Sequence, residues 1–384
     1  MVNTPRFPSF ASRQDTSEAH PVPPIRGDGR MTLEELVGAP VIAAIQQKGK
    51  LQFQAAGDTG VGSPAQVDVA QAMARDLDPV HRENGPLFFL NLGDIIYGQG
   101  KKKLYANSFY RPNLDYMHAP HSYDAFVLAI PGNHDGEVRD AEDRPSLSAY
   151  LDNFCQNPGM NAPMATTFGV TMPNQPGAYW WLDAPFLDLI GLYSNSKEND
   201  GMLGADASDT HQQIWLASTL TKIAAQRAQG RKALVIAVHH PPYSAGLQAH
   251  GSGHPGSPKM LKAIDTACTS AKIWPDMVLS AHSHNYQRYM RRLKIPGLQP
   301  LAEIPYCVMG GGGISIQPVP FGVGQNHSGT ATDKVAYENA LFSYGYGRIT
   351  ATANTISSTF VGTDQNHRNE FETVTIDLTT RQRI

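Results

Sequence analysis

The sequence has no long apolar run, no strong net charge and no secretory signal. No stretch approaches the ~20 consecutive apolar residues of a membrane-spanning helix, so we expect no membrane contact. The formal net charge of the 384-residue chain is −3, which argues against a broad nucleic-acid or membrane-surface footprint. The first forty residues contain arginines and prolines but not the ~7–15-residue apolar core of a signal peptide. We therefore expect a cytoplasmic protein, with a periplasmic or secreted one as the alternative.

Cysteine is also scarce. Cys155, Cys268 and Cys307 are odd in number and widely spaced. This pattern matches neither a zinc finger nor a disulfide framework. We predict three buried free thiols.

Short apolar runs alternate with amphipathic stretches along the first three quarters of the chain. Strands are expected at 51–56, 87–92, 126–130, 232–238 and 277–281, and helices at 64–77, 211–225 and 260–271. Short β segments follow, including an antiparallel edge strand or hairpin within 346–361. The order predicts an α/β sandwich. We divide the chain into a partly irregular N-terminal extension, residues 1–45, and one domain, residues 46–384.

Five of the predicted strands end in side chains that bind metals. Because open α/β sheets collect ligands at the carboxyl ends of their strands, these side chains should meet at one edge. They are Asp58, Asp94 with Tyr97, Asn133 with His134, His239, and His282 with His284.

Carboxylate, imidazole, amide and phenol ligands together suit iron, zinc or manganese. The absence of thiolates disfavours a structural zinc site. Without His134, these residues give seven candidate ligands, which exceed the needs of one tetrahedral ion. Two ions ~3.5–4 Å apart, bridged by one carboxylate, would use all seven.

Each residue also has an ordinary interpretation, as a turn aspartate or a hydrogen-bonded loop histidine. A separate alternative is a dinucleotide site, because Gly60 to Ala65 fits G-x-G-x-x-A between a strand and a helix. No acidic residue ends a second strand about 20 residues later, as that motif requires. The dinucleotide hypothesis also leaves the histidines unexplained.

The ordered motifs resemble those of the calcineurin-like metallophosphoesterases, and within them the purple acid phosphatases of the small tartrate-resistant type. The resemblance rests on Asp58-x-Gly60, Gly93-Asp-x-x-Tyr97, Gly132-Asn-His-Asp135, His239-His-Pro and His282-x-His284, and for the small tartrate-resistant type on the short loop from Tyr243 to Gly251, where a histidine faces the substrate. Most other branches have histidine where this chain has Gly60, whereas the purple branch combines glycine there with a tyrosine after the second aspartate. The resemblance implies a sandwich of two mixed β-sheets flanked by helices, with residues 46–384 as the catalytic domain.

The resemblance also implies the metal ligands. One ion would be held by Asp58, Asp94, Tyr97 and His284, and the other by Asp94, Asn133, His239 and His282, with Asp94 bridging. A phenolate is a hard anionic donor, so we expect Fe(III) at the tyrosine site and Zn, Fe or Mn(II) at the second. Ala281 departs from the glycine usual at that strand end, but it removes no ligand.

The implied activity is acid phosphatase-type hydrolysis of phosphate monoesters by a metal-bound hydroxide, with a small phosphorylated substrate. His134 is the first choice to contact the phosphate or protonate the leaving group, and His250 the second; His240 should be structural. A phosphodiesterase on the same metals and a non-catalytic phosphate- or metal-binding protein are the alternatives. Residues 310–313, four glycines, form either a tight turn or a phosphate cradle. The sequence leaves the substrate, the second metal and the oligomeric state open.

Overall fold

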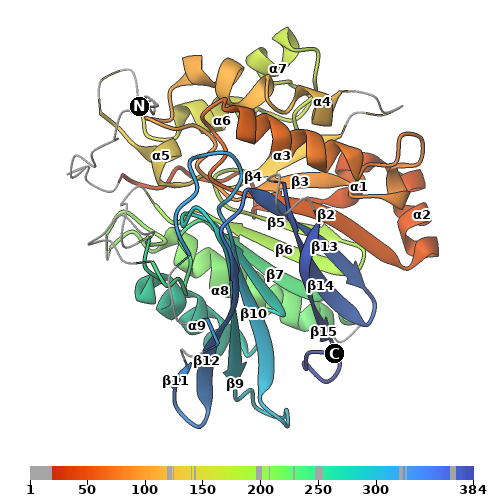
Figure 1. Ribbon diagram of the computed structural model, residues 1–384, viewed down its shortest axis with the longest axis vertical. Coiled ribbons are helices and arrows are strands. Elements are labelled where there is room, and N and C mark those ends of the chain that lie inside the picture. The colour runs from red at the N-terminus through yellow and green to blue at the C-terminus, as the bar shows by residue number, and fades with distance from the viewer. Residues whose placement is uncertain are drawn as a thin grey trace, which may run out of the picture.

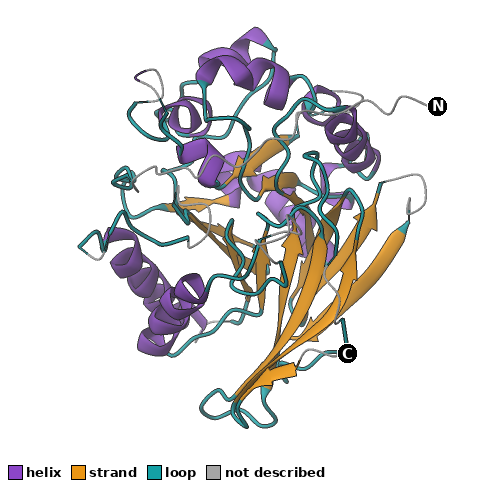
Figure 2. Cartoon of the chain, turned by 60° about the vertical axis from the view of Figure 1, so that its left-hand side comes forward, coloured by secondary structure: helices purple, strands orange, loops and turns teal. Residues whose placement is uncertain are grey.

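Two β-sheets pack face to face, and helices cover the outer face of each (Figures 1 and 2). The computed structural model describes residues 20–118, 123, 125–139, 141, 144–195, 201–206, 208–227, 230–246, 254–319, 323–324, 327–363 and 369–384. The predicted sandwich of two mixed sheets flanked by helices is confirmed.

The smaller sheet has the strand order β15-β14-β13-β2-β3-β4. Strands β2, β3 and β4 are parallel, and the β13–β14 hairpin joins β2 in antiparallel fashion. Their bounds are β2 Lys50–Ala56, β3 Phe88–Asn91, β4 Phe126–Ala129, β13 Gly345–Thr352, β14 Thr355–Gly362 and β15 Glu370–Asp377.

The larger sheet has the order β1-β5-β6-β7-β8-β10-β9-β12-β11. Strands β6, β7 and β8 are parallel, whereas β9, β10 and β12 form an antiparallel group. Their bounds are β1 Arg30–Thr32, β5 Trp180–Ala184, β6 Leu187–Leu192, β7 Ala233–Val238, β8 Met277–Ser280, β9 Tyr286–Leu293, β10 Ala302–Met309, β11 His327–Gly329 and β12 Asp333–Leu341.

The core lies between the sheets. Phe53 of β2 stacks on Phe88 of β3 with ring centroids 5.0 Å apart, and both pack in one buried cluster with Val235 of β7 and Leu279 of β8. The strands that lead to the predicted site are therefore buried on both faces, which explains their continuously apolar sequences.

Helices cover the two outer faces. Over the smaller sheet lie α3 and α6, and over the larger one α8 and α9, each with its own apolar cluster. Ser63 and Ser257 begin α3 and α9 as N-caps, as expected for serine followed by proline in the first turn. The bounds are α3 Pro64–Arg75, α4 Leu114–Met117, α5 Asn133–Gly136, α6 Ser148–Phe154, α7 Pro163–Thr167, α8 His211–Gln226 and α9 Pro258–Ala271.

The described part of the N-terminal extension packs on the domain. Thr32 and Glu35 form a capping box that begins α1 (Leu33–Val37), and α2 follows at Ala39–Lys48. Strand β1 pairs with β5, and Leu33 and Ile45 lie in the core between the sheets. The domain boundary at residue 45 stays a prediction.

The long segment after β3 contains short helices. They are a 3₁₀ turn at Lys102–Leu104, a π-helical turn at Ala106–Tyr110 and the single α-helical turn α4. Tyr105, Phe109 and Tyr110 are fully buried against α6. Among the described helices, none has the length and apolar composition needed to cross a bilayer. The three cysteines are free as predicted; Cys268 and Cys307 are buried, whereas Cys155 is only partly buried.

One buried carboxylate holds the beginnings of β7 and β8 together. Asp276 accepts a hydrogen bond from the Leu234 backbone (2.9 Å) and pairs with Arg227, Arg231 and Arg381. Burial would raise its pKa, but the three arginines outweigh burial and lower the pKa from the usual 3.8. The carboxylate thus stabilises the fold above its unfolded pKa, and the contribution is lost as the pH falls through the lower folded-state pKa.

We predict that Asp276→Asn lowers the free energy of unfolding by about 3–5 kcal/mol at neutral pH, because breaking a buried ion pair leaves its partners uncompensated. The difference from wild type should shrink as the pH falls below the ordinary aspartate pKa. Urea unfolding at several pH values measures both effects, with the exposed Asp68→Asn as control. An equal loss at every pH would contradict this account.

Candidate metal centre

The carboxyl ends of five parallel strands bring the predicted ligands together between the two sheets. Asp58 follows β2, Asp94 follows β3 and Asn133 begins the turn after β4, all in the smaller sheet. His239 follows β7 and His282 follows β8 in the larger sheet. The two sheets thus contribute opposite sides of one site.

Three of these residues have the left-handed backbone conformation, with φ of 57° at Asp58, 52° at Asp94 and 68° at His282. Such φ values are uncommon for residues with a side chain and are found where the surrounding structure enforces them. The turns after β2 and β3 are joined by hydrogen bonds from the Asp58 N–H to the Gly93 carbonyl (2.9 Å) and from the Thr59 N–H to the Asp94 carbonyl (3.2 Å).

Asp58, Tyr97 and His284 form the first group of potential ligands. The Tyr97 hydroxyl donates to Asp58 Oδ1 (2.7 Å) and lies 3.2 Å from His284 Nε2. His284 Nδ1 lies 3.2 Å from the Ser315 carbonyl. If Nδ1 donates to this carbonyl, as is usual for histidines that bind metals, Nε2 is left free to bind an ion.

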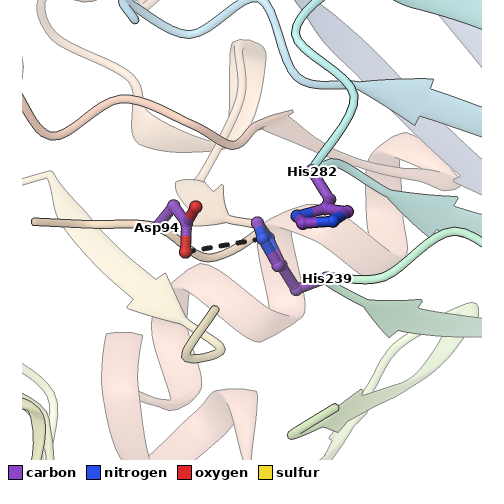
Figure 3. Close-up of side chains that lie close together, drawn as sticks. All are labelled: Asp94, His239 and His282. Atoms are coloured by element: carbon purple, nitrogen blue, oxygen red, sulfur yellow. Dashed lines mark ion pairs between the residues drawn. The ribbon is translucent and has the colours of Figure 1, made fainter. Parts of the chain in front are cut away.

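Asn133, His239 and His282 form the second group, together with Asp94. His239 Nε2 lies 3.0 Å from Asn133 Oδ1 and 3.4 Å from Asp94 Oδ1, while its Nδ1 lies 2.9 Å from the Leu92 carbonyl. Figure 3 shows Asp94, His239 and His282 facing one another, and each offers a ligand atom within 4.8 Å of the others. His282 Nε2 is buried and has no hydrogen-bond partner among the described residues.

Asp94 belongs to both groups. Its carboxylate accepts from the His134 backbone (3.0 Å), faces His239, and interacts with the Tyr97 hydroxyl. Its side chain is 1% exposed. The two groups of oxygen and nitrogen donors, the shared carboxylate and the unpartnered His282 nitrogen fit metal ions of the hard or borderline type.

Burial and neighbouring charges shift the pKa of each of these groups. Burial raises the pKa of Asp58 to about 7, and burial with the charges of Asp58 and Asp94 raises the pKa of Tyr97 well above 10. Burial also lowers the pKa of His282 and His284, the latter to about 3. For Asp94, burial acts upward, but the charges of His239 and His134 outweigh it and lower the pKa. Bound cations favour the deprotonated forms of all these ligands.

The glycine of the first motif determines where Tyr97 lies. A Cβ at Gly60 would overlap the carbonyl oxygen of Ile95, so no side chain fits there. The Gly60 carbonyl accepts from the Tyr97 N–H (2.9 Å). The same turn is held by Asp135, whose carboxylate accepts from the N–H groups of Ile95 and Ile96 (both 3.1 Å).

The remaining histidines differ in position. His134 is 26% exposed at the edge of the site, with Nε2 3.9 Å from Asp94 Oδ2 and Nδ1 3.4 Å from Glu137 Oε2. His240 is buried, its Nδ1 lies 2.7 Å from Ser194 Oγ, and its ring packs on His282. His250 lies outside the described residues.

Sequence reasoning missed His254. Its ring packs on that of His282, with centroids 4.0 Å apart, and lies 5.7 Å from the ring of His284. Its Nδ1 is buried and has no hydrogen-bond partner in the described part of the chain. Beyond the two histidines that directly follow β7, the loop between β7 and α9 contains two more, and the resemblance of its stretch from Tyr243 to Gly251 to a family loop favoured His250 over His254.

Two other motifs have structural roles here. In the turn after β10, the N–H groups of Gly310 and Gly312 donate to the carbonyls of Asn285 and Gly57, which favours the tight turn over a phosphate cradle. In the G-x-G-x-x-A segment, the Gly62 N–H donates to the Gln66 side chain (2.7 Å), so this amide is used within the protein.

Ala281, which replaces the usual glycine, is fully buried in the core between the sheets. Its methyl group lies where a Cβ on Gly57 would be. The Ala281 methyl therefore fills the space beside a glycine and leaves His282 in place.

Comparisons with known proteins agree with the fold. The family model described as calcineurin-like phosphoesterase matches residues 53–286. The structure of GAP50, described as the anchor in the inner membrane complex of Plasmodium, is similar at a TM-score of 0.55 and 11% identity, over 87% of this chain and 90% of that one. A structure of PhoD is similar at a TM-score of 0.49 and 13% identity, over 88% of this chain and 72% of that one. No curated protein sequence matches significantly.

We predict that Gly60→Ala displaces the Ile95–Tyr97 turn and lowers the free energy of unfolding by about 1–3 kcal/mol or more, because the new methyl group meets backbone. Chemical denaturation measures the loss. Val61→Ala, an exposed position in the same turn, is the control and should change stability by less than about 0.5 kcal/mol. A Gly60→Ala protein of wild-type stability would show that the close packing is not required.

Proposed function

The chain belongs to the calcineurin-like phosphoesterase family, and we propose that it hydrolyses phosphate monoesters at two metal ions held between the sheets. The family consists of metal-dependent hydrolases of phosphoesters. Three parts of the proposal go beyond membership of the family: the preference for monoesters, the presence of two ions and the identity of each ion.

A single observation carries the proposal: Asp94 belongs to two separate groups of ligands. Its carboxylate interacts with the Tyr97 hydroxyl, which donates to Asp58, and its Oδ1 lies 3.4 Å from His239 Nε2. A carboxylate shared in this way is what a bridged pair of ions requires.

The donor types suggest which ion each group would hold. Asp58, Asp94, Tyr97 and His284 offer three anionic oxygens, which favour a trivalent ion such as Fe(III). Asp94, Asn133, His239 and His282 offer a less charged set that suits Zn, Fe or Mn in the divalent state. The bound ions would supply Lewis-acid activation of water and charge neutralisation of the phosphate.

The chain's own residues position these groups. The carbonyls of Leu92 and Ser315 orient the His239 and His284 rings, and Asp135 holds the turn that carries Tyr97. His134 is the partly exposed imidazole beside Asp94, and Glu137 lies 3.4 Å from its Nδ1. This arrangement supports a role for His134 Nε2 as the donor to a phosphoryl oxygen or to the departing alkoxide.

A small phosphate monoester fits this set of charges. Its dianion carries one more negative charge than a diester, and two cations with a histidine donor offer it three points of contact. His254, packed on His282 and His284, is a further candidate histidine near the substrate, and the role of His250 stays a prediction.

The direct test compares turnover of an aryl phosphate monoester with that of the matching diester, over acidic to alkaline pH, on protein reconstituted with iron and zinc. We expect preference for the monoester and an acidic to near-neutral optimum. Asp94→Asn should lose most of the activity, because the substitution weakens the binding of both ions. Preference for the diester would move the proposal to phosphodiesterase activity on the same site, and no turnover with metals bound would leave a binding protein.

For His134→Gln we predict a fall in kcat/KM of about 10²–10⁴-fold, the range for loss of a proton donor, with the metal content unchanged. His211→Gln removes a histidine whose side chain is 87% exposed at the start of α8, and it should have no effect. Steady-state kinetics with metal analysis separates the two. Activity of His134→Gln within about threefold of wild type would exclude His134 from the chemistry.

For Tyr97→Phe we predict loss of visible absorption from the iron-loaded protein, because a phenolate bound to Fe(III) gives a charge-transfer band and a phenyl ring does not. The matched control is Tyr123→Phe, whose hydroxyl donates to the Asp78 carbonyl far from the site. A band that survives in Tyr97→Phe would show that the tyrosine does not bind the ferric ion.

A further inference from the structure

A second pocket lies at the opposite ends of β7 and β8 from the metal centre. It has a volume of about 280 Å³, close to the lower end of the roughly 300–1,000 Å³ range of ligand pockets. The residues that line it come from the ends of α8 and α9, the turn between β9 and β10 and the C-terminal segment after β15.

Three arginines of this pocket surround one carboxylate. Asp276 Oδ1 lies 2.5 Å from an Arg231 nitrogen and 3.3 Å from an Arg381 nitrogen, and Asp276 Oδ2 lies 3.4 Å from an Arg227 nitrogen. Asp276 is fully buried. Lys272, which follows α9, adds a fourth cation at the rim.

The guanidinium groups are not saturated. The Nε atoms of Arg227, Arg231 and Arg381 are all buried and have no hydrogen-bond partner among the described residues. The Arg381 side chain is only 5% exposed, and its backbone has the left-handed conformation, with φ of 55°. Buried donors without an acceptor are rare in native proteins and call for a partner.

The positive charge is also only partly compensated. The nearby carboxylate of Asp188 forms an ion pair with Lys232, with Nζ 2.9 Å from Oδ1. The C-terminal carbonyl groups of α8 and α9 favour the positive charges of Arg227 and Lys272. These carbonyl groups do not accept hydrogen bonds from the arginine Nε atoms. Burial lowers the pKa of Arg227 and of Arg381, the charge of Asp276 opposes this, and that of Arg231 adds to it.

One wall of the pocket is apolar. Trp274, 9% exposed, and Leu298 of the β9–β10 turn line it, together with Ile273 and Ile295. A ligand that fills the pocket therefore combines an anionic group with an apolar one. The three arginines outnumber the carboxylate that they share, so the pocket suits an anionic group, and guanidinium groups bind phosphate through paired hydrogen bonds.

We propose that this pocket is a binding site for a small organic phosphate, with the phosphate on Arg227, Arg231 and Arg381 and the apolar portion against Trp274 and Leu298. The site is separate from the metal centre and does not depend on the proposed reaction. The strands β7 and β8 run between the two sites, since they begin next to Asp276 and end at His239 and His282.

The test is calorimetric titration of the full chain with phenylphosphonate at a pH where it is a dianion. The probe carries an aryl group on a P–C bond, so an esterase cannot cleave it. It can also bind the metals, and the Asp94→Asn variant removes that contribution. We expect one binding event that survives in Asp94→Asn.

In the Asp94→Asn background, Arg231→Gln should weaken this event at least about tenfold, as expected for loss of a charge-assisted hydrogen bond. Leu298→Glu, which places a carboxylate at the partly exposed rim, should weaken it similarly without removing an arginine. Lys262→Gln removes an exposed charge from α9 outside the pocket and should leave the affinity within about twofold.

The proposal is overturned if all binding disappears with Asp94→Asn. It is also overturned if Leu298→Glu and a folded Arg231→Gln protein both keep the affinity of their parent. Circular dichroism shows whether each variant is folded. If Arg231→Gln does not fold, the affinity of Leu298→Glu alone tests the proposal.

Discussion

Buried polar contacts between the two sheets fix the position of every residue in the candidate metal centre. The Asp58 carboxylate accepts from the His282 N–H (2.7 Å), and the His239 ring reaches from the larger sheet to the Leu92 carbonyl (2.9 Å) in the smaller one. Burying these groups is unfavourable unless each has a partner. The polar contacts of the site therefore also connect the two sheets. The same contacts stabilise the left-handed turns at Asp58, Asp94 and His282.

Much of the candidate site could be predicted from the sequence because five of its residues lie one to four positions after the end of a recognisable strand. Fully buried parallel strands have continuously apolar sequences, so their ends are easy to find, and the next residue lies at the ligand edge. Asp58, Asp94, Asn133, His239 and His282 are all placed in this way. Tyr97 and His284 come from turns, and the closeness of Tyr97 to Asp58 depends on a backbone contact at Gly60 that spacing alone does not reveal.

Other parts of the fold could not be predicted for physical reasons. Strand β9 contains Arg288 and Arg291, which are buried because they pair with Glu372, Glu338, Asp265 and Asp333. Their partners come from β12, β15 and α9, far away in sequence, so the strand looks polar until the pairs are known. The aromatic residues of the segment after β3 likewise pack against α6, and His254 reaches the site only through the path of its loop.

The central claim is that one carboxylate, Asp94, joins two metal ions. The most direct measurement is a crystal structure of the metal-loaded protein with anomalous scattering collected at the iron and zinc edges. We expect two ions ~3.5–4 Å apart, both in contact with Asp94, with the iron in the ligand group that contains Tyr97. A single ion, or two ions that do not share Asp94, would contradict it.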